Sequence, residues 1–485
     1  MRSSSPSESP ANRPIWGPPL NLGQAQFSSH TNLKSNLESN LGHQFGTGTI
    51  LFGNPIWDRH NSLRNKGEKS GIQFGTGTIL FGIKARNRGG APYHLYRLRM
   101  GRKRSDIVDE AHSGVYHCIS RCVRRESLLS DPRRRGWIVE QLEFLAQYGA
   151  IDVLAFCVME NHLHLLLRTR PEVAAAWPDH EIALRKVTLL ASHRKRSKDT
   201  AADAQAALKL EVAIFMKSPE RVRTARRDLS SLSFFHKLLK EPCAKKWNRE
   251  DKVTGHFWEG RFKSPKVLDQ GALENVAGYI ELNEIHACAA TSIPSSIWTS
   301  AQIQWQRFCD GVKRACLDGA ATPDNLRKQL LDLRWEPVFP CQTMCSGEST
   351  GDTIRSTPTD GNPVSTRSLL QHLHCVDQAG RRRRLDKAGW IPDSEPDAVG
   401  SAIARVHASL SRGSQVVRLA AHSVATWWSE LREGLTSSLL PILLEDGARS
   451  LLNSTRGSCY GSRESIALEA TRRGVKRMLP VWSSV

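Results

Sequence analysis

The run from Val158 to Arg168 constrains the fold of this chain more than any other stretch. It is largely apolar and holds two histidines two positions apart, His162 and His164. In a β-strand alternate side chains point to opposite faces, so the intervening leucines would fill a core and the histidines would share the other face. At a rise of about 3.3 Å per residue their Cα atoms lie roughly 6–7 Å apart, and the two imidazoles can converge on one divalent ion. The alternative is a surface pair or a hydrogen-bonded pair of histidines.

The segments before this run predict a β-α-β-β order. Residues 114–121 alternate as a strand, and residues 134–148 carry an apolar stripe at helical spacing that stops at Gly149. Residues 152–159 are typical of a second strand. The order suits a ferredoxin-like sheet, so we expect an α+β fold with an antiparallel sheet and helices on one face.

Three further elements are predicted downstream. Residues 232–247 form a helix, and residues 256–267 form a strand with Arg261 and Lys263 on one face. Asp269 can cap the next helix. That helix carries Tyr279 and Asn283 at positions i and i+4, which project from one edge.

Four blocks of this sequence resemble one known family. They are Gly114–Arg121, Met159–Leu167, His256–Ser264 and Tyr279–Asn283. In this order they resemble the single-tyrosine transposases with a His-hydrophobic-His motif, particularly the branch associated with repetitive extragenic palindromes. The resemblance covers roughly residues 110–290.

The resemblance implies that Tyr279 is a nucleophile. A tyrosine hydroxyl attacks poorly at pH 7, since its ordinary pKa is about 10. It becomes useful where a metal neutralises the phosphate that it attacks. Attack on a phosphodiester in single-stranded DNA would leave a 5′-phosphotyrosine and a free 3′-hydroxyl. The bond energy is stored, so rejoining needs no nucleotide cofactor.

A divalent metal is therefore the expected cofactor. His162 and His164 would supply two neutral nitrogen ligands, and the resemblance implies that Asn283, an amide four residues after the nucleophile, is the third. His286 competes for that place, and Glu160 could be a ligand or its hydrogen-bond partner. Mixed nitrogen and oxygen coordination suits Mg²⁺ or Mn²⁺, and Mn²⁺ is better matched to imidazole.

The charge of the chain favours a polyanionic partner. The 485 residues carry a formal net charge of +20, and each phosphate neutralised by a protein releases counterions. We expect Arg121, Arg168, Arg261 and Lys263 to contact DNA, most simply single-stranded palindromic or hairpin sites. A generally basic protein is the alternative. The expected assembly is a monomer or a homodimer.

Residues 1–99 do not read as a folded domain. They are rich in Ser, Asn, Gly and Pro, and Gln44–Gly53 recurs without change as Gln73–Gly82. Two copies are too few for a solenoid. A small adhesive or nucleic-acid-binding arm is one interpretation. We favour translated upstream DNA, and we expect a chain that begins at Met100 to fold and bind DNA.

The rest of the chain divides into three predicted regions. Residues 100–300 form the transposase-like domain with an insertion at about 170–230, residues 301–367 are rich in linkers, and residues 368–485 form a helical C-terminal extension. The extension holds a second His-Leu-His, His372 to His374. Its predicted helix, residues 369–376, points positions i and i+2 roughly 200° apart, so these histidines cannot share an ion.

The cysteine spacing and the hydropathy of the sequence indicate the cellular compartment that we expect for the protein. The eleven cysteines include no C-x-x-C pair, which favours reduced thiols and a cytoplasmic protein. No apolar stretch approaches about 18 residues, so we expect no membrane span. Two other functions stay open: a non-catalytic DNA- or RNA-hairpin-binding protein on the same scaffold, and a decayed transposase.

Overall fold

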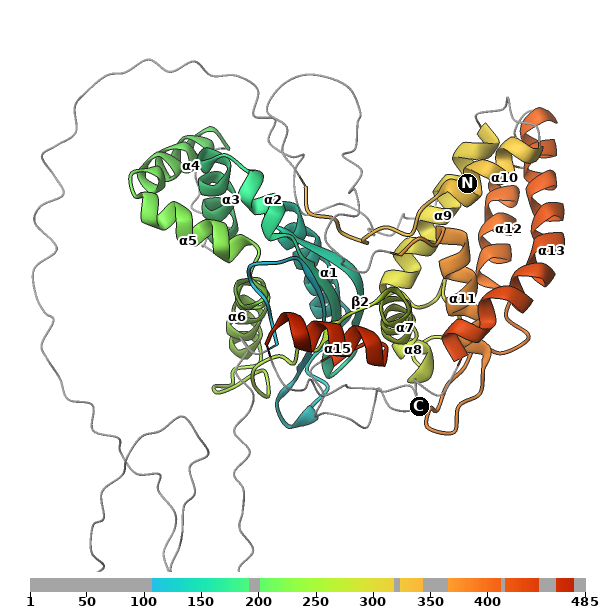
Figure 1. Ribbon diagram of the computed structural model, residues 1–485, viewed down its shortest axis with the longest axis horizontal. Coiled ribbons are helices and arrows are strands. Elements are labelled where there is room, and N and C mark those ends of the chain that lie inside the picture. Colours follow the sequence, from blue (N-terminus) through green and yellow to red (C-terminus); the bar gives the residue numbers. More distant parts are fainter. Residues whose placement is uncertain are drawn as a thin grey trace, which may run out of the picture. The chain divides into compact units, whose positions relative to one another are not determined.

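The computed structural model of the chain describes residues 107–191, 201–317, 323–342, 365–410, 415–444 and 459–474 (Figure 1). The repeat-containing segment, and with it the expectation for a chain that begins at Met100, lies outside the described residues.

The described residues form one five-stranded sheet. Its strands are β1 (Gly114–Arg121), β2 (Ile151–Val158), β3 (His162–Thr169), β4 (Lys266–Val267) and β5 (Cys459–Tyr460), in the order β2-β3-β1-β4-β5. β3 lies antiparallel between β1 and β2, and β4 is antiparallel to β1. The first four strands have the ferredoxin-like order, which confirms the predicted α+β class. β5 adds a parallel edge from the far end of the chain.

One face of the sheet packs on helices α1 (Pro132–Tyr148) and α6 (Leu232–Glu250). Asp131 caps α1 by accepting a hydrogen bond from Arg133 N at 2.8 Å, and Pro132 stands in the first turn, where its missing N–H costs nothing. A short 3-10 turn, η2 (Val123–Arg125), links β1 to this region. The leucines of β3 that alternate with the histidines are buried on this face, as the sequence predicted.

The predicted insertion is a group of helices. They are α2 (Pro171–Ala176), α3 (Asp179–Ala191), α4 (Ala201–Met216) and α5 (Pro219–Leu229). α3 packs against α4 and α5. Ser218 caps α5 by accepting a hydrogen bond from Arg221 N, so the helices have defined starts and extend the domain without entering the sheet.

The opposite face of the sheet is also covered, although the sequence analysis expected helices on one face only. Val115, Leu166 and Val267 point apolar side chains to that face, and burying them requires a second layer. α7 (Gln270–Glu281) supplies it with the stripe that includes Leu273 and Ile280, both buried. α8 (Asn283–His286) follows directly.

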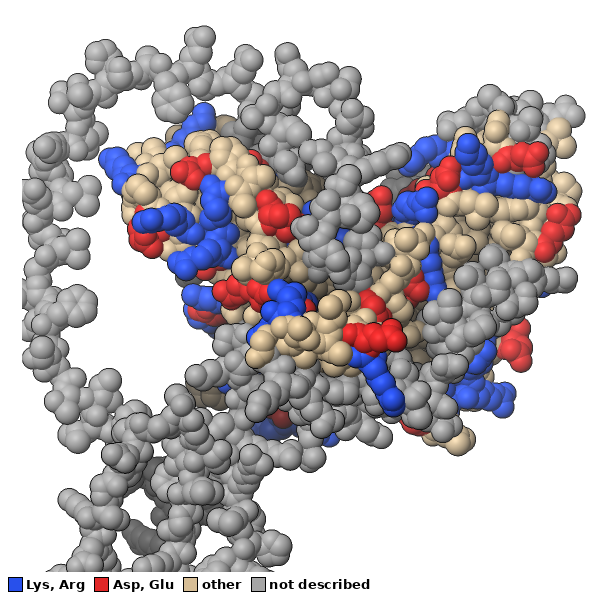
Figure 2. All heavy atoms as spheres, in the orientation of Figure 1, with Lys and Arg blue, Asp and Glu red and all other residues tan. Residues whose placement is uncertain are grey.

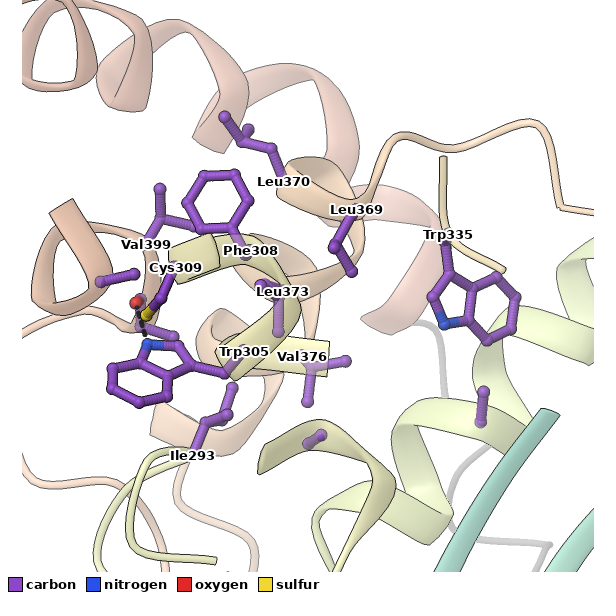
Figure 3. Packing of buried hydrophobic residues seen from close by; sticks show 14 of the residues in the cluster. Ile293, Trp305, Phe308, Cys309, Trp335, Leu369, Leu370, Leu373, Val376 and Val399 are labelled. Atoms are coloured by element: carbon purple, nitrogen blue, oxygen red, sulfur yellow. Dashed lines mark hydrogen bonds between the residues drawn. The ribbon is translucent and has the colours of Figure 1, made fainter. Parts of the chain in front are cut away.

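Helices beyond α8 extend this second core (Figure 3). They are α9 (Ser300–Leu317), α10 (Pro323–Asp332), α11 (Leu369–Arg381), α12 (Ala398–Leu410), α13 (Gln415–Leu444) and α15 (Arg463–Arg472). Trp305 is buried and donates its indole N–H to Ala398 O at 2.8 Å. Where the sequence analysis expected a linker-rich region from residue 301, α9 and α10 stand instead, because Trp305, Phe308 and Val312 recur at helical spacing and are buried.

The predicted strand at 256–267 is largely wrong. Only Lys266 and Val267 form a ladder strand, and the rest of the segment touches β1 through isolated bridges. Gly260 weakens extended pairing, and Pro265 has no N–H to donate to a ladder. The segment therefore follows β1 irregularly, but its aromatic residues Trp258 and Phe262 are buried in the core.

Candidate nucleophile and histidine face

Three histidines lie on one face of the sheet. His162 and His164 come from β3, and the pairing of β1 with β3 brings His117 beside them. The ring centroids of His162 and His164 are 4.9 Å apart, and those of His117 and His164 are 5.1 Å apart. The structure thus brings the two predicted ligands together and adds a third imidazole.

Hydrogen bonds leave one nitrogen of each predicted ligand available. His164 Nδ1 lies 2.9 Å from His117 Nε2, and His162 Nδ1 lies 2.6 Å from Asn161 Oδ1. The Nε2 atoms of His162 and His164 have no hydrogen-bond partner within the described part of the chain. Burial lowers the pKa of His162 to about 4 and that of His164 well below its usual value, so both rings are neutral at pH 7.

Tyr279 stands beside the histidines. α7 brings its ring to 5.8 Å from the ring of His164 and 6.1 Å from that of His117, edge-on to both. The side chain is half-buried. Burial raises the pKa of Tyr279 to about 12, while Arg384 and Arg121 act in the opposite direction. Cys157 and Asp386 raise the pKa further, so the phenol is protonated at pH 7 and only the two arginines favour its anion.

Asn283 and His286 follow on α8. The Asn283 amide nitrogen donates to Tyr279 O at 3.0 Å and to Ile280 O at 3.2 Å, which leaves Oδ1 as the atom that could face a ligand. Both ring nitrogens of His286 are buried, and neither has a hydrogen-bond partner among the residues that the structure describes. Glu160 is exposed in the turn between β2 and β3.

The types of donor atom in this region suit a divalent ion. Two neutral imidazole nitrogens and an amide oxygen match an ion that accepts mixed nitrogen and oxygen ligands, and the unpaired nitrogens of His286 add a buried polar group that lacks a partner. Within the described residues, no group of three or more His, Cys, Asp or Glu side chains is arranged to hold a metal.

The four cations expected to contact DNA have different surroundings. Arg121 is half-buried and pairs across the sheet with His162. Arg168 is buried, and its Nε lies 2.7 Å from Asp152 Oδ2, so its charge is already matched inside the protein. Arg261 and Lys263 are exposed on the irregular segment beside β1.

Sequence reasoning missed a cation from the C-terminal region. The Lys387 amine lies 5.3 Å from the centroid of the Tyr279 ring. It makes no ion pair with an acid among the described residues, and burial together with Arg384 lowers its pKa. An unmatched, half-buried cation favours an anion beside it. Nothing in the sequence pattern around Lys387 predicts that it lies beside Tyr279.

Sequence reasoning also missed His117 and Tyr460. Tyr460 is only 2% exposed, and its hydroxyl lies 2.9 Å from His117 Nδ1. The alternation of β1 could have placed His117 opposite Tyr116, but only the register with β3 reveals that it faces His164. Tyr460 stands 343 positions from His117, beyond any local signal.

The face of the molecule drawn in Figure 2 does not mark a DNA path by charge alone. On the face shown in Figure 2, Lys and Arg side chains are interspersed with Asp and Glu. No helix in the described ranges is long and apolar enough to cross a membrane.

The comparison with protein families agrees with this geometry. Residues 110–199 match the family model described as transposase IS200 like. The matched residues run from the loop before β1 to just beyond α3 and include both predicted histidine ligands, and they end before Tyr279. The match supports a transposase-family function and a DNA partner. No curated protein and no solved structure matches the chain.

Proposed function

We propose that this protein is a metal-dependent single-stranded DNA transesterase that nicks and rejoins DNA through a 5′-phosphotyrosine on Tyr279. The observation that carries the proposal is the position of the Tyr279 ring, 5.8 Å from that of His164 and beside the His162–His164 pair. This places a half-buried hydroxyl next to two neutral imidazoles with available nitrogens.

The ligands in the proposal are His162, His164 and Asn283 through its amide oxygen. A bound Mg²⁺ or Mn²⁺ would supply neutralisation of the negative charge on the attacked phosphate. The protein would hold that phosphate with Arg121 and Lys387, which lie around Tyr279 and lack a buried acid partner in the described structure. Arg261 and Lys263 are exposed for contacts further along the strand, whereas Arg168 is engaged by Asp152.

The chemical step moves one phosphoryl group. Tyr279 Oη forms a bond to phosphorus, and the bond from phosphorus to the 3′ oxygen breaks. The phenolic proton leaves Tyr279, and a proton arrives at the 3′ oxygen, so the step is balanced. Reversal by a different 3′-hydroxyl rejoins the strand. Because the phosphoester is conserved, no nucleotide cofactor is consumed.

The substrate in the proposal is a palindromic or hairpin site, as in the branch associated with repetitive extragenic palindromes. The resemblance of the four sequence blocks supports this choice, and the net charge of +20 supports a polyanionic partner.

Tyr460 is the other tyrosine near the histidines, and burial separates it from Tyr279. Tyr460 is 2% exposed and its hydroxyl is hydrogen-bonded to His117, whereas Tyr279 is half-buried and its hydroxyl has no hydrogen bond among the described residues. A phosphodiester can reach Tyr279 more easily, so we assign the attack to it.

The test is covalent capture of a hairpin oligonucleotide with Mn²⁺. A 3′-end label should appear in a protein adduct on a denaturing gel, and a 5′-end label should appear in a released fragment. Tyr279→Phe removes one oxygen and should bind DNA normally yet form no adduct. Tyr460→Phe at saturating Mn²⁺ should still form one. An adduct that persists in Tyr279→Phe and vanishes in Tyr460→Phe would move the attack to Tyr460.

A further inference from the structure

A chain of hydrogen bonds ends at His164. Tyr460 Oη lies 2.9 Å from His117 Nδ1, and His117 Nε2 lies 2.9 Å from His164 Nδ1. The exposed fractions of Tyr460, His117 and His164 are 2%, 1% and 5%, so water does not compete for these bonds. A buried chain of three hydrogen-bonded side chains fixes the orientation of each ring and also stabilises the fold.

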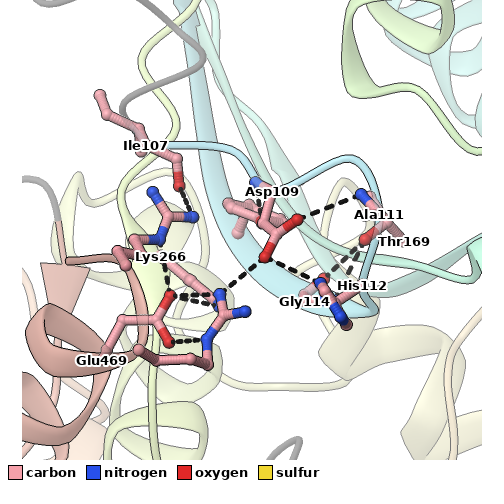
Figure 4. Close-up of polar contacts among 11 residues, drawn as sticks. Ile107, Asp109, Ala111, His112, Gly114, Thr169, Lys266 and Glu469 are labelled. Atoms are coloured by element: carbon pink, nitrogen blue, oxygen red, sulfur yellow. Dashed lines mark hydrogen bonds and ion pairs between the residues drawn. The ribbon is translucent and has the colours of Figure 1, made fainter.

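The C-terminal segment that carries Tyr460 is firmly attached. β5 pairs with β4, and Leu268 N donates to Tyr460 O at 3.0 Å. Figure 4 shows Glu469 of α15 beside Lys266 of β4, and their ion pair measures 2.8 Å. This pair is largely buried, so the attachment resists solvent screening better than a surface pair.

The same segment also contacts the residues that precede β1. Arg472 Nη2 lies 2.7 Å from Asp109 Oδ2, and Arg473 Nη2 donates to Ile107 O at 2.8 Å. Figure 4 draws both contacts as dashed lines, one at Asp109 and the other at Ile107. The segment that carries Tyr460 is therefore attached both to β4 and to the residues before β1. These two attachments fix the position of the Tyr460 hydroxyl relative to His117.

The proton arrangement in this chain decides whether His164 can bind a metal. A neutral imidazole carries one N–H, so its other nitrogen holds the lone pair. If His164 Nδ1 donates to His117 Nε2, the lone pair of His164 is on Nε2, which faces the candidate site. His117 then carries its proton on Nδ1 and needs an acceptor there, and the oxygen of Tyr460 is that acceptor. In the opposite arrangement, Tyr460 donates to His117 Nδ1 and His117 Nε2 donates to His164 Nδ1. His164 then carries its proton on Nε2, and this nitrogen could not bind a metal.

The geometry points to Tyr460 and His117 as positioning residues that hold His164 in the tautomer and orientation required for a divalent cation at Nε2. The inference rests on the proposed function, because it concerns the same metal site. Partners of this kind usually donate to or accept from a ligating histidine through a single bond. Here the support extends through a second imidazole to a tyrosine supplied by the C-terminal segment.

Mn²⁺ titration of the full chain without DNA, followed by electron paramagnetic resonance, tests the inference. Tyr460→Phe should weaken Mn²⁺ binding about tenfold, and His117→Phe should weaken it by as much or more, since outer partners contribute roughly 10–100-fold to metal affinity. Tyr116→Phe is the matched control. It removes another buried hydroxyl from the opposite face of β1, and it should leave Mn²⁺ affinity unchanged. Wild-type affinity in a folded Tyr460→Phe would overturn the inference.

A second measurement needs no substitution. In wild-type protein labelled with ¹⁵N-histidine and loaded with Mg²⁺, the ring nitrogen spectra should show protons on Nδ1 of both His117 and His164. A proton on His117 Nε2 in the loaded protein would overturn the inference even where the variants fail to fold.

The outcomes for the two claims are distinct. If wild-type protein binds Mn²⁺ no better than His162→Ala, the metal site of the proposed function fails. If wild-type protein binds Mn²⁺, His162→Ala does not, and Tyr460→Phe equals wild type, only the positioning role fails.

Discussion

The chain contains the triplet His-Leu-His twice, and the two copies have different surroundings. In β3, His162 and His164 lie on one face with ring centroids 4.9 Å apart. In α11, His372 bonds Glu281 at 2.8 Å and stacks on Trp335 at 4.4 Å, while His374 meets the edge of Trp428 at 5.5 Å. A spacing of two residues brings side chains together only where the backbone period is two. The sequence predicted this helix, and the structure confirms it.

The largest expected effect separates the two triplets by activity. His162→Ala or His164→Ala should lower the nicking rate by roughly three orders of magnitude, since metal neutralisation of a phosphate contributes several kcal/mol. DNA affinity should fall only a few-fold, because Arg and Lys contacts to phosphates dominate binding. The measurements are nicking of a labelled hairpin and DNA binding by anisotropy.

His374→Phe is the control for that experiment, since it changes the helical triplet and keeps an aromatic ring. It should nick at the wild-type rate. Unchanged cleavage by the His162→Ala, His164→Ala double variant would break the comparison.

The next effect separates the triplets by stability. His372→Ala removes a buried hydrogen bond to Glu281 and the stacking on Trp335. We expect the free energy of unfolding to fall by about 2–3 kcal/mol. Urea titration measures it. The nicking rate well below the unfolding midpoint should be unchanged, and a lost rate in folded His372→Ala would show that the helical triplet also serves the site.

A smaller effect on the nicking rate is expected from Lys387, which follows the His372–His374 triplet of α11 in the sequence. Lys387→Met keeps the apolar stem and removes the charge beside Tyr279. We expect the nicking rate to fall about tenfold, which corresponds to one charge-assisted hydrogen bond to phosphate. Lys245→Met, on an exposed lysine of α6, is the control. Equal rates for the two variants would remove Lys387 from the site.

The smallest effect concerns protonation of the strand histidines in metal-free protein. Burial lowers the pKa of His117 to about 3 and that of His162 to about 4, whereas an unfolded chain binds these protons near pH 6.5. Between about pH 6.5 and pH 4 the unfolded state therefore holds more protons, and stability falls as the pH falls. Above pH 6.5 both states are neutral and the contribution is complete.

Urea midpoints at pH 7 and pH 5, in the presence of a chelator, measure this dependence. His162→Asn removes one of the two titrating rings, so its midpoint should drop less between the two pH values than that of the wild type. An equal drop in both proteins would contradict the assignment of acid sensitivity to His162.

The elements with a clear period could be predicted from the sequence. The strands and helices around the histidine pair, from β1 to β3, lie within a few residues of the expected bounds, and α7 begins at the expected cap, Asp269. Each has an unbroken apolar pattern that one buried face explains. The segment at 256–267 has no such pattern, because Gly260 and Pro265 interrupt it.

The candidate site was only half predictable. The His162–His164 pair follows from one strand. Tyr279 and Asn283 follow from a family resemblance and from one predicted helix, which the structure divides into α7 and α8 at Leu282. His117, Lys387 and Tyr460 reach the same place through strand register and long-range packing. No local spacing encodes a contact between positions 117 and 460, so these residues could be found only in three dimensions.

The sequence separation of His117 and Tyr460 also determines how much time passes between the synthesis of the two residues. A ribosome adds roughly 5–20 residues per second, so Tyr460 is made about 20–70 seconds after His117. β1, β2 and β3 can pair early, but the last acceptor of the histidine chain is made long after these strands. A chain released early would expose the histidine strand without the tyrosine that supports it. Synthesis of the segment that carries Tyr460 thus becomes a condition for the hydrogen-bonded support of His164.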